Sequence, residues 1–408
     1  MNSIQKTILC KILQGEKMHK TLNSLLRHTA IRNATVIALA ALFFSLAIPC
    51  LLKAEDFKPL FNGKDLSGWV LVNTPPQTWS IQDGMLICSG KPIGEIRTER
   101  MYQNFELELE WRHMVPGGNA GIFVWADDIT ARGVPFHRGV EVQVLENAYG
   151  NTQGYSTHGD IFPIHGAEMT PINGRGGNRA FPTELRSKPS PEWNHYRIVC
   201  NDGNISLSVN GKEVTKGTKA SPSKGYICIE SEGGIVHYRN VRIKELPDTP
   251  VDAKNIATAN RGFRSIYSGL DLVGWKIADN AKARWEAKDW VLTYRAMGDK
   301  QPSRLEYAQP VRIAGFVVDF RFSDASAGLN LIAAGFKSPI SIRNSEESNY
   351  YAALEKQGSW NRIIGEVSGD KMKLLINGKS FELPYSNSEG AFALESLGDL
   401  DLANIYIR

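Results

Sequence analysis

Residues 105–111 read Phe-Glu-Leu-Glu-Leu-Glu-Trp, so an apolar side chain stands at every second position. A period of two over seven residues indicates a β-strand with one buried and one solvated face. The same alternation occurs at 139–144, 205–209 and 236–241, each segment being bounded by Gly, Asn, Asp or Pro. No segment after residue 54 keeps a 3.6-residue apolar period over ten residues. We therefore expect an all-β protein of sandwich or jelly-roll type.

The chain also contains an internal repeat. The spaced aromatic, Gly, Asp, Leu, Gly and Trp residues of 57–69 recur at 263–275, and matched positions follow in the same order to the chain end. Two tandem copies of one domain explain this pattern, the second being degenerate. We place the copies at 55–247 and 261–408, with 248–260 as a polar linker.

The two copies differ in the length of one segment. Gly121 and Trp193 are 72 positions apart, whereas the matching Gly328 and Trp360 are 32 apart, so the first copy holds about 40 extra residues. A long polar insertion in a compact domain is usually functional or disordered. We interpret residues shared by both copies as scaffold and polar residues found only in the first copy as candidates for function.

The N-terminal 54 residues differ from the rest in charge and hydropathy. They hold seven Lys and Arg, one acid, and an uncharged apolar run from Ala34 to Leu52. Such a segment is typical of a secretory signal, although 19 uncharged residues also approach the roughly 20 that span a bilayer. We expect 1–54 to be a signal peptide or N-terminal anchor and the protein to be periplasmic or secreted. Membrane contact is expected only if the leader is an uncleaved anchor.

Net charge gives no indication of a nucleic-acid partner. Removing the leader's seven basic residues and one acid from totals of 47 and 43 leaves 40 basic and 42 acidic residues, a formal charge of −2. The whole-chain value of +4 therefore belongs to the leader. Cys88, Cys200 and Cys228 follow it without metal-ligand spacing. We predict no metal site and no required cofactor, a divalent ion being possible but unsupported.

Several motifs of the first copy, taken together, resemble the 3-keto-disaccharide hydrolase domain family over about 55–247. They are Phe57 to Trp69, Gly94 to Thr98, Phe105 to Trp111, Gly117 to Phe123, Gly139 to Asn147, Glu192 to Asn194 and Arg239 to Ile243. The resemblance implies a concanavalin A-like jelly roll. It also implies export and action on saccharides whose C3 hydroxyl has been oxidised by a separate sugar 3-dehydrogenase.

The chemistry of such a substrate defines the groups it needs. A C3 ketone makes the C2 hydrogen acidic, so a base can remove it, an acid can protonate the glycosidic oxygen, and water can add to the resulting enone. A cationic or hydrogen-bonding group would stabilise the enolate oxygen. The candidate catalytic residues are Glu141, His165, His158 and Glu146. The candidate substrate-binding residues are Arg97, Gln143, Trp125, Asp160 and Arg179.

Two other functions stay open at the level of sequence. Residues 141–146 read Glu-Val-Gln-Val-Leu-Glu, which is close to the bulged strand of retaining jelly-roll glucanases. Glu141 and Glu146 could then form the carboxyl pair of a conventional retaining glycoside hydrolase. The other alternative is a non-catalytic carbohydrate-binding module. A saccharide is the expected ligand in every case.

Overall fold

The computed structural model describes residues 57–150, 158–299 and 301–408. Their regular structure is β-strand, joined by short 3-10 helices. These helices are η1 Pro76–Thr78, η2 Ala253–Asn255, η3 Asp279–Arg284 and η4 Tyr351–Ala353. The all-β prediction is confirmed. No helix among the described residues is long and apolar enough to cross a membrane. The predicted leader, 1–54, lies outside the described residues.

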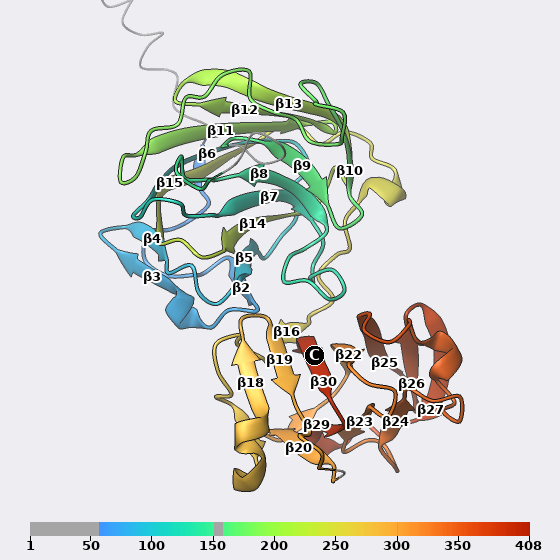
Figure 1. Ribbon diagram of the computed structural model, residues 1–408. Helices are drawn as coiled ribbons and strands as arrows, with labels where there is room; N and C mark the ends of the chain where they lie inside the picture. The colour runs from blue at the N-terminus through green and yellow to red at the C-terminus, as the bar shows by residue number, and fades with distance from the viewer. Residues whose placement is uncertain (1–56, 151–157, 300) are drawn as a thin grey trace, which may run out of the picture. The chain divides into compact units, whose positions relative to one another are not determined.

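The first half of the described chain is a sandwich of two antiparallel sheets (Figure 1). The larger sheet has the order β10-β13-β12-β11-β6-β15-β4-β3, with β1 also paired to β15. Its strands are β1 Lys58–Pro59, β3 Trp79–Gln82, β4 Met85–Cys88, β6 Phe105–His113, β10 Glu168–Pro171, β11 Asn194–Asn201, β12 Asn204–Val209, β13 Lys212–Ser221 and β15 Val236–Glu245. The smaller sheet has the order β2-β5-β14-β7-β8-β9. Its strands are β2 Trp69–Val72, β5 Gly94–Thr98, β7 Gly121–Ala126, β8 Gly139–Gln143, β9 Ile161–Ile164 and β14 Tyr226–Ser231.

The second half repeats this arrangement with fewer strands. Its larger sheet has the order β18-β19-β30-β22-β25-β26-β27, with β16 paired to β30. Its strands are β16 Arg264–Ser265, β18 Trp285–Lys288, β19 Val291–Tyr294, β22 Gly315–Phe322, β25 Asn361–Ser368, β26 Lys371–Ile376, β27 Lys379–Pro384 and β30 Leu400–Ile407. The smaller sheet has the order β17-β20-β29-β23-β24, and a separate ribbon pairs β21 with β28. These strands are β17 Trp275–Ile277, β20 Ser303–Tyr307, β21 Val311–Arg312, β23 Gly328–Ala333, β24 Ile340–Arg343, β28 Glu389–Gly390 and β29 Phe392–Leu397.

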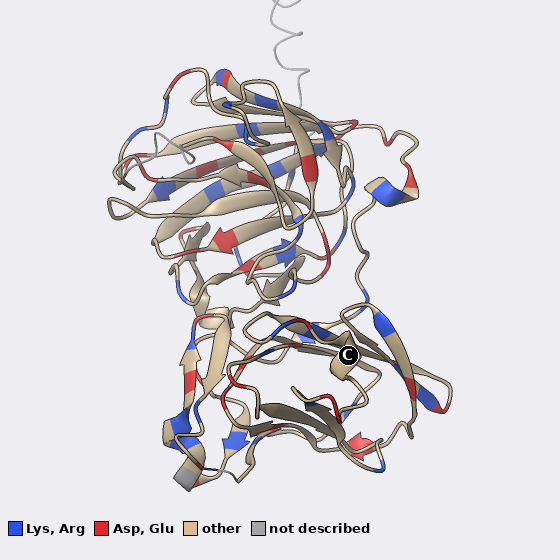
Figure 2. Ribbon diagram, turned by 45° about the vertical axis from the view of Figure 1, so that its right-hand side comes forward, with Lys and Arg blue, Asp and Glu red and all other residues tan. Residues whose placement is uncertain are grey.

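Side-chain alternation explains why each pair of sheets stacks. Along β6, Phe105, Leu107, Leu109 and Trp111 are buried, and the intervening glutamates are partly exposed. Each half has its own apolar core between its two sheets. On the strands of the first half, positive and negative residues are interspersed (Figure 2). Two tandem concanavalin A-like sandwiches, the second reduced, are therefore confirmed. The residues from 57 to 408 form one compact unit, so the limits drawn between the halves stay a prediction.

Candidate functional site

One face of the six-stranded sheet is lined by acidic side chains. The opposite face packs into the core through Ile96, Ile122, Val140 and Ile229. Because side chains alternate along a strand, the residues between these project from the other side. They include Glu95 on β5, Glu141 and Gln143 on β8, Glu230 on β14, and Glu232 just beyond it. We call these five residues the acidic face.

Gly121 on β7 makes the closest approach within the acidic face possible. A Cβ at this position would lie 2.7 Å from Oε1 of Glu141 and 3.0 Å from Oε2 of Glu230. The two carboxyl groups therefore occupy the space that a side chain at residue 121 would fill. Glu141 is 6% exposed and Glu230 1% exposed, so neither carboxyl is well solvated. Two carboxyl groups held close together in a dry site resist being ionised at the same time.

Burial and mutual repulsion change the acidity of these groups. Burial raises the pKa of Glu141 well above its usual value; the charge of Glu232 raises it further, and Arg179 opposes the rise. Burial also raises the pKa of Glu230 well above its usual value, with Glu232 and Glu141 adding to the effect. For Glu232, burial raises the pKa to about 7. The cluster therefore holds both protonated and ionised carboxyl groups near neutral pH.

The side-chain amides of Asn119 and Gln143 form hydrogen bonds at the edge of the acidic face, close to the start of β7. The side-chain amide of Asn119 donates a hydrogen bond to Oε2 of Glu232. Nε2 of Gln143 donates to Oδ1 of Asn119 over 2.8 Å and to the carbonyl of Ala120 over 3.3 Å. Gln143 thus orients Asn119, and Asn119 in turn orients the Glu232 carboxyl. The predicted residue Gln143 lies on the same face as Glu141.

A cation lies near the other side of Glu141. Arg179 pairs through Nη1 with the buried carboxylate of Asp160 at 3.0 Å, and its guanidinium lies over the ring of Phe162 at 3.4 Å. Phe162 on β9 stands directly opposite Glu141 on β8. The predicted residues Asp160 and Arg179 are therefore brought to the neighbourhood of Glu141. His165 lies on the turn after β9, where partial burial lowers its pKa and the nearby charge of Glu95 opposes that shift.

Three groups of metal-ligand type meet beside the acidic face. A carboxylate oxygen of Glu95, Nδ1 of His137 and Sγ of Cys228 lie within 4.8 Å of one another, and all three residues are buried. His137 Nδ1 already contacts Oε2 of Glu95. Without a metal cation beside it, the Cys228 thiol has its pKa raised well above its usual value by burial. The three donor atoms thus form one buried cluster at the edge of the acidic face.

Four predicted site residues either lie away from the acidic face or already form hydrogen bonds with other groups of the protein. Glu146 accepts from the backbone N–H of Gly117, Ala148 and Ser190 at 2.7, 2.7 and 3.0 Å. Although burial raises the pKa of Glu146, these bonds bring it below its usual value. Its carboxylate closes loops instead of pairing with Glu141 in the arrangement that a retaining glycosidase needs.

His158 lies inside the sandwich. Its Nδ1 donates to the carbonyl of Leu145 over 2.7 Å, its Nε2 is 3.1 Å from Oη of Tyr196, and its ring lies 5.1 Å from that of Trp111. Burial lowers the pKa of His158 to about 4, so the ring is neutral at physiological pH. The structure therefore does not bring His158 to the acidic face.

Trp125 and Arg97 are also enclosed. Trp125 belongs to the apolar core, and its indole N–H donates to the carbonyl of Gln103 over 2.9 Å. Arg97 shares the side of β5 that carries Glu95, but it is 1% exposed and donates to the carbonyls of Asp128 and Thr98. Both side chains donate N–H groups to backbone carbonyls, so these groups hold the local structure instead of contacting a sugar as the sequence suggested.

Sequence reasoning did not select Glu230, Glu232, Glu95 or His137. Glu230 matches Glu395 of the second copy, so it falls among the shared residues that we interpret as scaffold. Glu95 stands two residues before Arg97 in a motif chosen for its arginine, and alternation alone would have put both on one face. The register of β14 against β5, which sets Glu230 opposite Glu95, depends on long-range pairing.

The corresponding face of the second half has a different charge pattern. Strand register puts Arg304 and Glu306 of β20 where β5 carries Glu95 and Arg97, so both charges are reversed. Glu395 keeps the place of Glu230 but accepts from Asn330 over 2.6 Å. The clustered acids of the first half have no counterpart among these described residues. This difference favours the first half as the reactive one.

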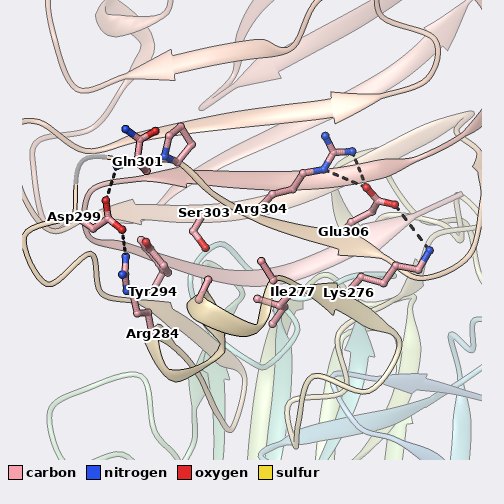
Figure 3. A pocket seen from close by; sticks show the side chains of 12 residues that line it. Lys276, Ile277, Arg284, Tyr294, Asp299, Gln301, Ser303, Arg304 and Glu306 are labelled. Atoms are coloured by element: carbon pink, nitrogen blue, oxygen red, sulfur yellow. Dashed lines mark hydrogen bonds and ion pairs between the residues drawn. The ribbon is translucent and has the colours of Figure 1, made fainter.

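Arg304 and Glu306 line a cavity of about 450 Å³ in the second half (Figure 3). Its charged groups are already paired with each other, Arg284 with Asp299 at 2.5 Å and Arg304 with Glu306 at 2.6 Å. A charged ligand in this cavity would therefore have to break an existing ion pair to bind most of the lining charges. We therefore base the candidate site on the acidic face.

The two sheets and the acidic face define a class: a jelly-roll domain that presents buried carboxyl groups on one sheet. Residues 56–244 match the family model described as the 3-keto-alpha-glucoside-1,2-lyase-like domain. The resemblance inferred from the motifs is confirmed by this match over residues 56–244.

Individual relatives cover the same half. A 3-keto-disaccharide hydrolase of Bacteroides thetaiotaomicron is 26% identical, with 51% of this chain and 83% of the relative aligned. A structure from Parabacteroides distasonis, provisionally described as a glycosyl hydrolase, is 24% identical with a TM-score of 0.37, covering 48% of this chain and 96% of that one. A carbohydrate-binding module, CBM66 of Bacillus subtilis, is 11% identical with a TM-score of 0.32, covering 44% and 96%.

Proposed function

We propose that the first half is a carbohydrate hydrolase that cleaves the glycosidic bond of 3-keto-disaccharides by elimination and hydration. The observation that carries the proposal is the pair of buried carboxyl groups, Glu141 and Glu230, held on either side of Gly121. Acid–base chemistry at neutral pH needs carboxyl groups whose pKa is raised towards 7, and burial and crowding raise it here. The family match over 56–244 supports the substrate class.

The reaction needs one proton removed and one supplied in each of two stages. A base takes the C2 proton, and the electron pair moves into the enolate of the C3 ketone. The enolate then collapses to a C1–C2 double bond, the C1–O bond breaks, and an acid protonates the departing oxygen. Water next adds its oxygen to C1 while C2 regains a proton, so the net reaction is hydrolysis.

Three carboxyl groups of the acidic face suit these roles. We assign Glu141 as the base because Arg179 lies close enough to favour its ionised form and to stabilise the enolate oxygen. We assign Glu232 as the acid because its pKa of about 7 lets it hold and release a proton near neutrality. Glu230 meets Glu141 at the Cβ position of Gly121 and stands two residues before Glu232, so it can pass a proton from one to the other.

The test is a comparison of two substrates that differ only in oxidation state. We expect the purified protein to release 3-keto-glucose from 3-keto-trehalose and to leave trehalose intact. Glu141→Gln is expected to lower kcat at least 100-fold. Glu395→Gln is the control, because it removes a glutamate carboxyl group from the corresponding sheet of the second half. Cleavage of trehalose would instead indicate a conventional glycosidase, and binding without turnover a carbohydrate-binding module.

Export and substrate supply are part of the same proposal. The apolar run in 1–54 supports a periplasmic or secreted enzyme. A 3-keto-disaccharide arises by oxidation of one secondary hydroxyl, so a sugar dehydrogenase must act before this protein. Both statements stay predictions, and fractionation of the expressing cells would test the first directly.

A further inference from the structure

One loop of the first half contacts both the acidic face and the second half. Residues 127–138 join β7 to β8, whereas only 334–339 join the matching strands β23 and β24. The segment folds back on itself through a bridge between Thr130 and His137. On one side, Phe136 stacks on Phe123 at 5.9 Å and His137 contacts Glu95. That side therefore lies against the sheet that carries the acidic face.

The other side of segment 127–138 is hydrogen-bonded to the larger sheet of the second half. Asp319 on β22, which is fully buried, accepts from the backbone N–H of Gly133 over 2.8 Å. Asn404 on β30 donates to the carbonyl of Val134 over 2.9 Å and to Asp319 over 2.7 Å. Oγ1 of Thr130 and Oη of Tyr406 are 3.0 Å apart.

Comparison of the copies indicates that this second-half surface is specialised for contact. In the first half, Glu108 on β6 stands between Arg197 on β11 and Arg242 on β15, and both arginines pair with it at 3.8 and 2.8 Å. These side chains project from the outer face of the larger sheet, where a partly exposed charged row is expected.

The same row of the second half is apolar. Val317 on β22 stands between Ile364 on β25 and Tyr406 on β30, in the register of the charged row. Val317 and Tyr406 are 0% and 2% exposed, and Ile129 of the first half packs against them. An apolar row on the outer face of a sheet is stable only when something covers it. We call Val317, Asp319, Ile364, Asn404 and Tyr406 the docking face.

We propose that the second half acts as an intramolecular clamp, whose docking face fixes segment 127–138 and thereby positions His137 against Glu95 beside the acidic face. His137 is a positioning residue in this account, because it contacts a carboxyl group of the face and not the substrate. The catalytic consequence rests on the proposed function, whereas the clamp itself does not. The second copy has therefore kept the fold and replaced a solvated outer row by a contact surface.

The test is made in the full-length protein. It introduces into the docking face the charged residues that the first half carries at the matching positions. Val317→Glu with Tyr406→Arg recreates the pair formed by Glu108 and Arg242. The second half should still fold, because Val317 and Tyr406 lie outside its own core. The control is Thr293→Arg, which puts an arginine on the outer face of the same sheet, where Thr293 bonds Asp401 at 3.1 Å.

Amide hydrogen exchange and histidine NMR test whether the clamp is formed, and neither measurement depends on enzymatic activity. In the double variant we expect the amide of Gly133 to exchange at least tenfold faster and the ring nitrogen shifts of His137 to change, with both unchanged in Thr293→Arg. On 3-keto-trehalose we expect kcat to fall about tenfold with KM within twofold. Unchanged exchange at Gly133, an unchanged His137 spectrum, or equal effects of the control would overturn the clamp. An inactive wild type would contradict the proposed function, while these two spectroscopic readouts would still decide the clamp.

Discussion

Gly121→Ala is the substitution that separates site geometry from stability most clearly. The new Cβ would lie 2.7 Å from Oε1 of Glu141 and 3.0 Å from Oε2 of Glu230. Ordinary contacts of this kind are about 3.4 Å or longer, so the two carboxyl groups must move by about 0.4 to 0.7 Å. Both clashing atoms are ends of flexible side chains, and we expect the free energy of unfolding to fall by only about 1 kcal/mol.

The expected loss of activity is larger than the loss of stability. Since a misplacement of about 1 Å can cost about 100-fold, a shift half that size predicts about a tenfold drop in kcat/KM on 3-keto-trehalose. Gly94→Ala gives the contrast, because its Cβ would lie 2.7 Å from the backbone oxygen of Val72 and should destabilise the fold instead. Gly177→Ala, with nothing within 4 Å, is the neutral control.

Kinetics on 3-keto-trehalose and urea unfolding measure the two quantities. The reasoning is refuted if Gly121→Ala keeps full kcat/KM at unchanged stability, because the carboxyl pair would then not be positioned by the space at residue 121. A loss of stability as large as that of Gly94→Ala would refute the claim that the clash is confined to side-chain ends.

Two further predictions concern single groups. Glu230→Gln should lower kcat about 100-fold or more with the fold intact by circular dichroism, because it removes the proton carrier between Glu141 and Glu232; full activity would contradict this role. The pKa of His158 is lowered by burial from 6.5 to about 4, so the folded state binds fewer protons than the unfolded state between these values. The free energy of unfolding should therefore fall by up to about 3 kcal/mol as the pH drops from about 6.5 to 4. Urea titrations at several pH values should show that His158→Gln loses most of this pH dependence. An equal pH dependence in the variant would refute the assignment to His158.

The fold was predictable because its determinants are local. Alternation in stretches such as Phe105 to Trp111 specifies strands, and the recurrence of residues 57–69 at 263–275 specifies two copies. The same alternation correctly put Glu141 and Gln143 on one face of a strand. These inferences need only the order of residues along the chain and no knowledge of which strands pair.

The candidate site was only partly predictable because it depends on pairing between distant strands. Glu230 lies near Glu141 only because β7 pairs with both β8 and β14, with Gly121 between the two carboxyl groups. His158 shows the opposite error: a histidine in a polar insertion suggested a site, but its loop turns the ring into the core. Shared residues also proved ambiguous, since Glu230 and Glu395 match in sequence and differ in surroundings.

Running the reaction in D₂O is the most direct test of the central claim. That claim is that a carboxyl group of the first half removes the C2 proton of a 3-keto-disaccharide. The account predicts that 3-keto-glucose released from 3-keto-trehalose at early times carries deuterium at C2, above the level that 3-keto-glucose acquires without the protein. Product that retains hydrogen at C2 would contradict it, because the bond at C1 would then have been broken without proton removal.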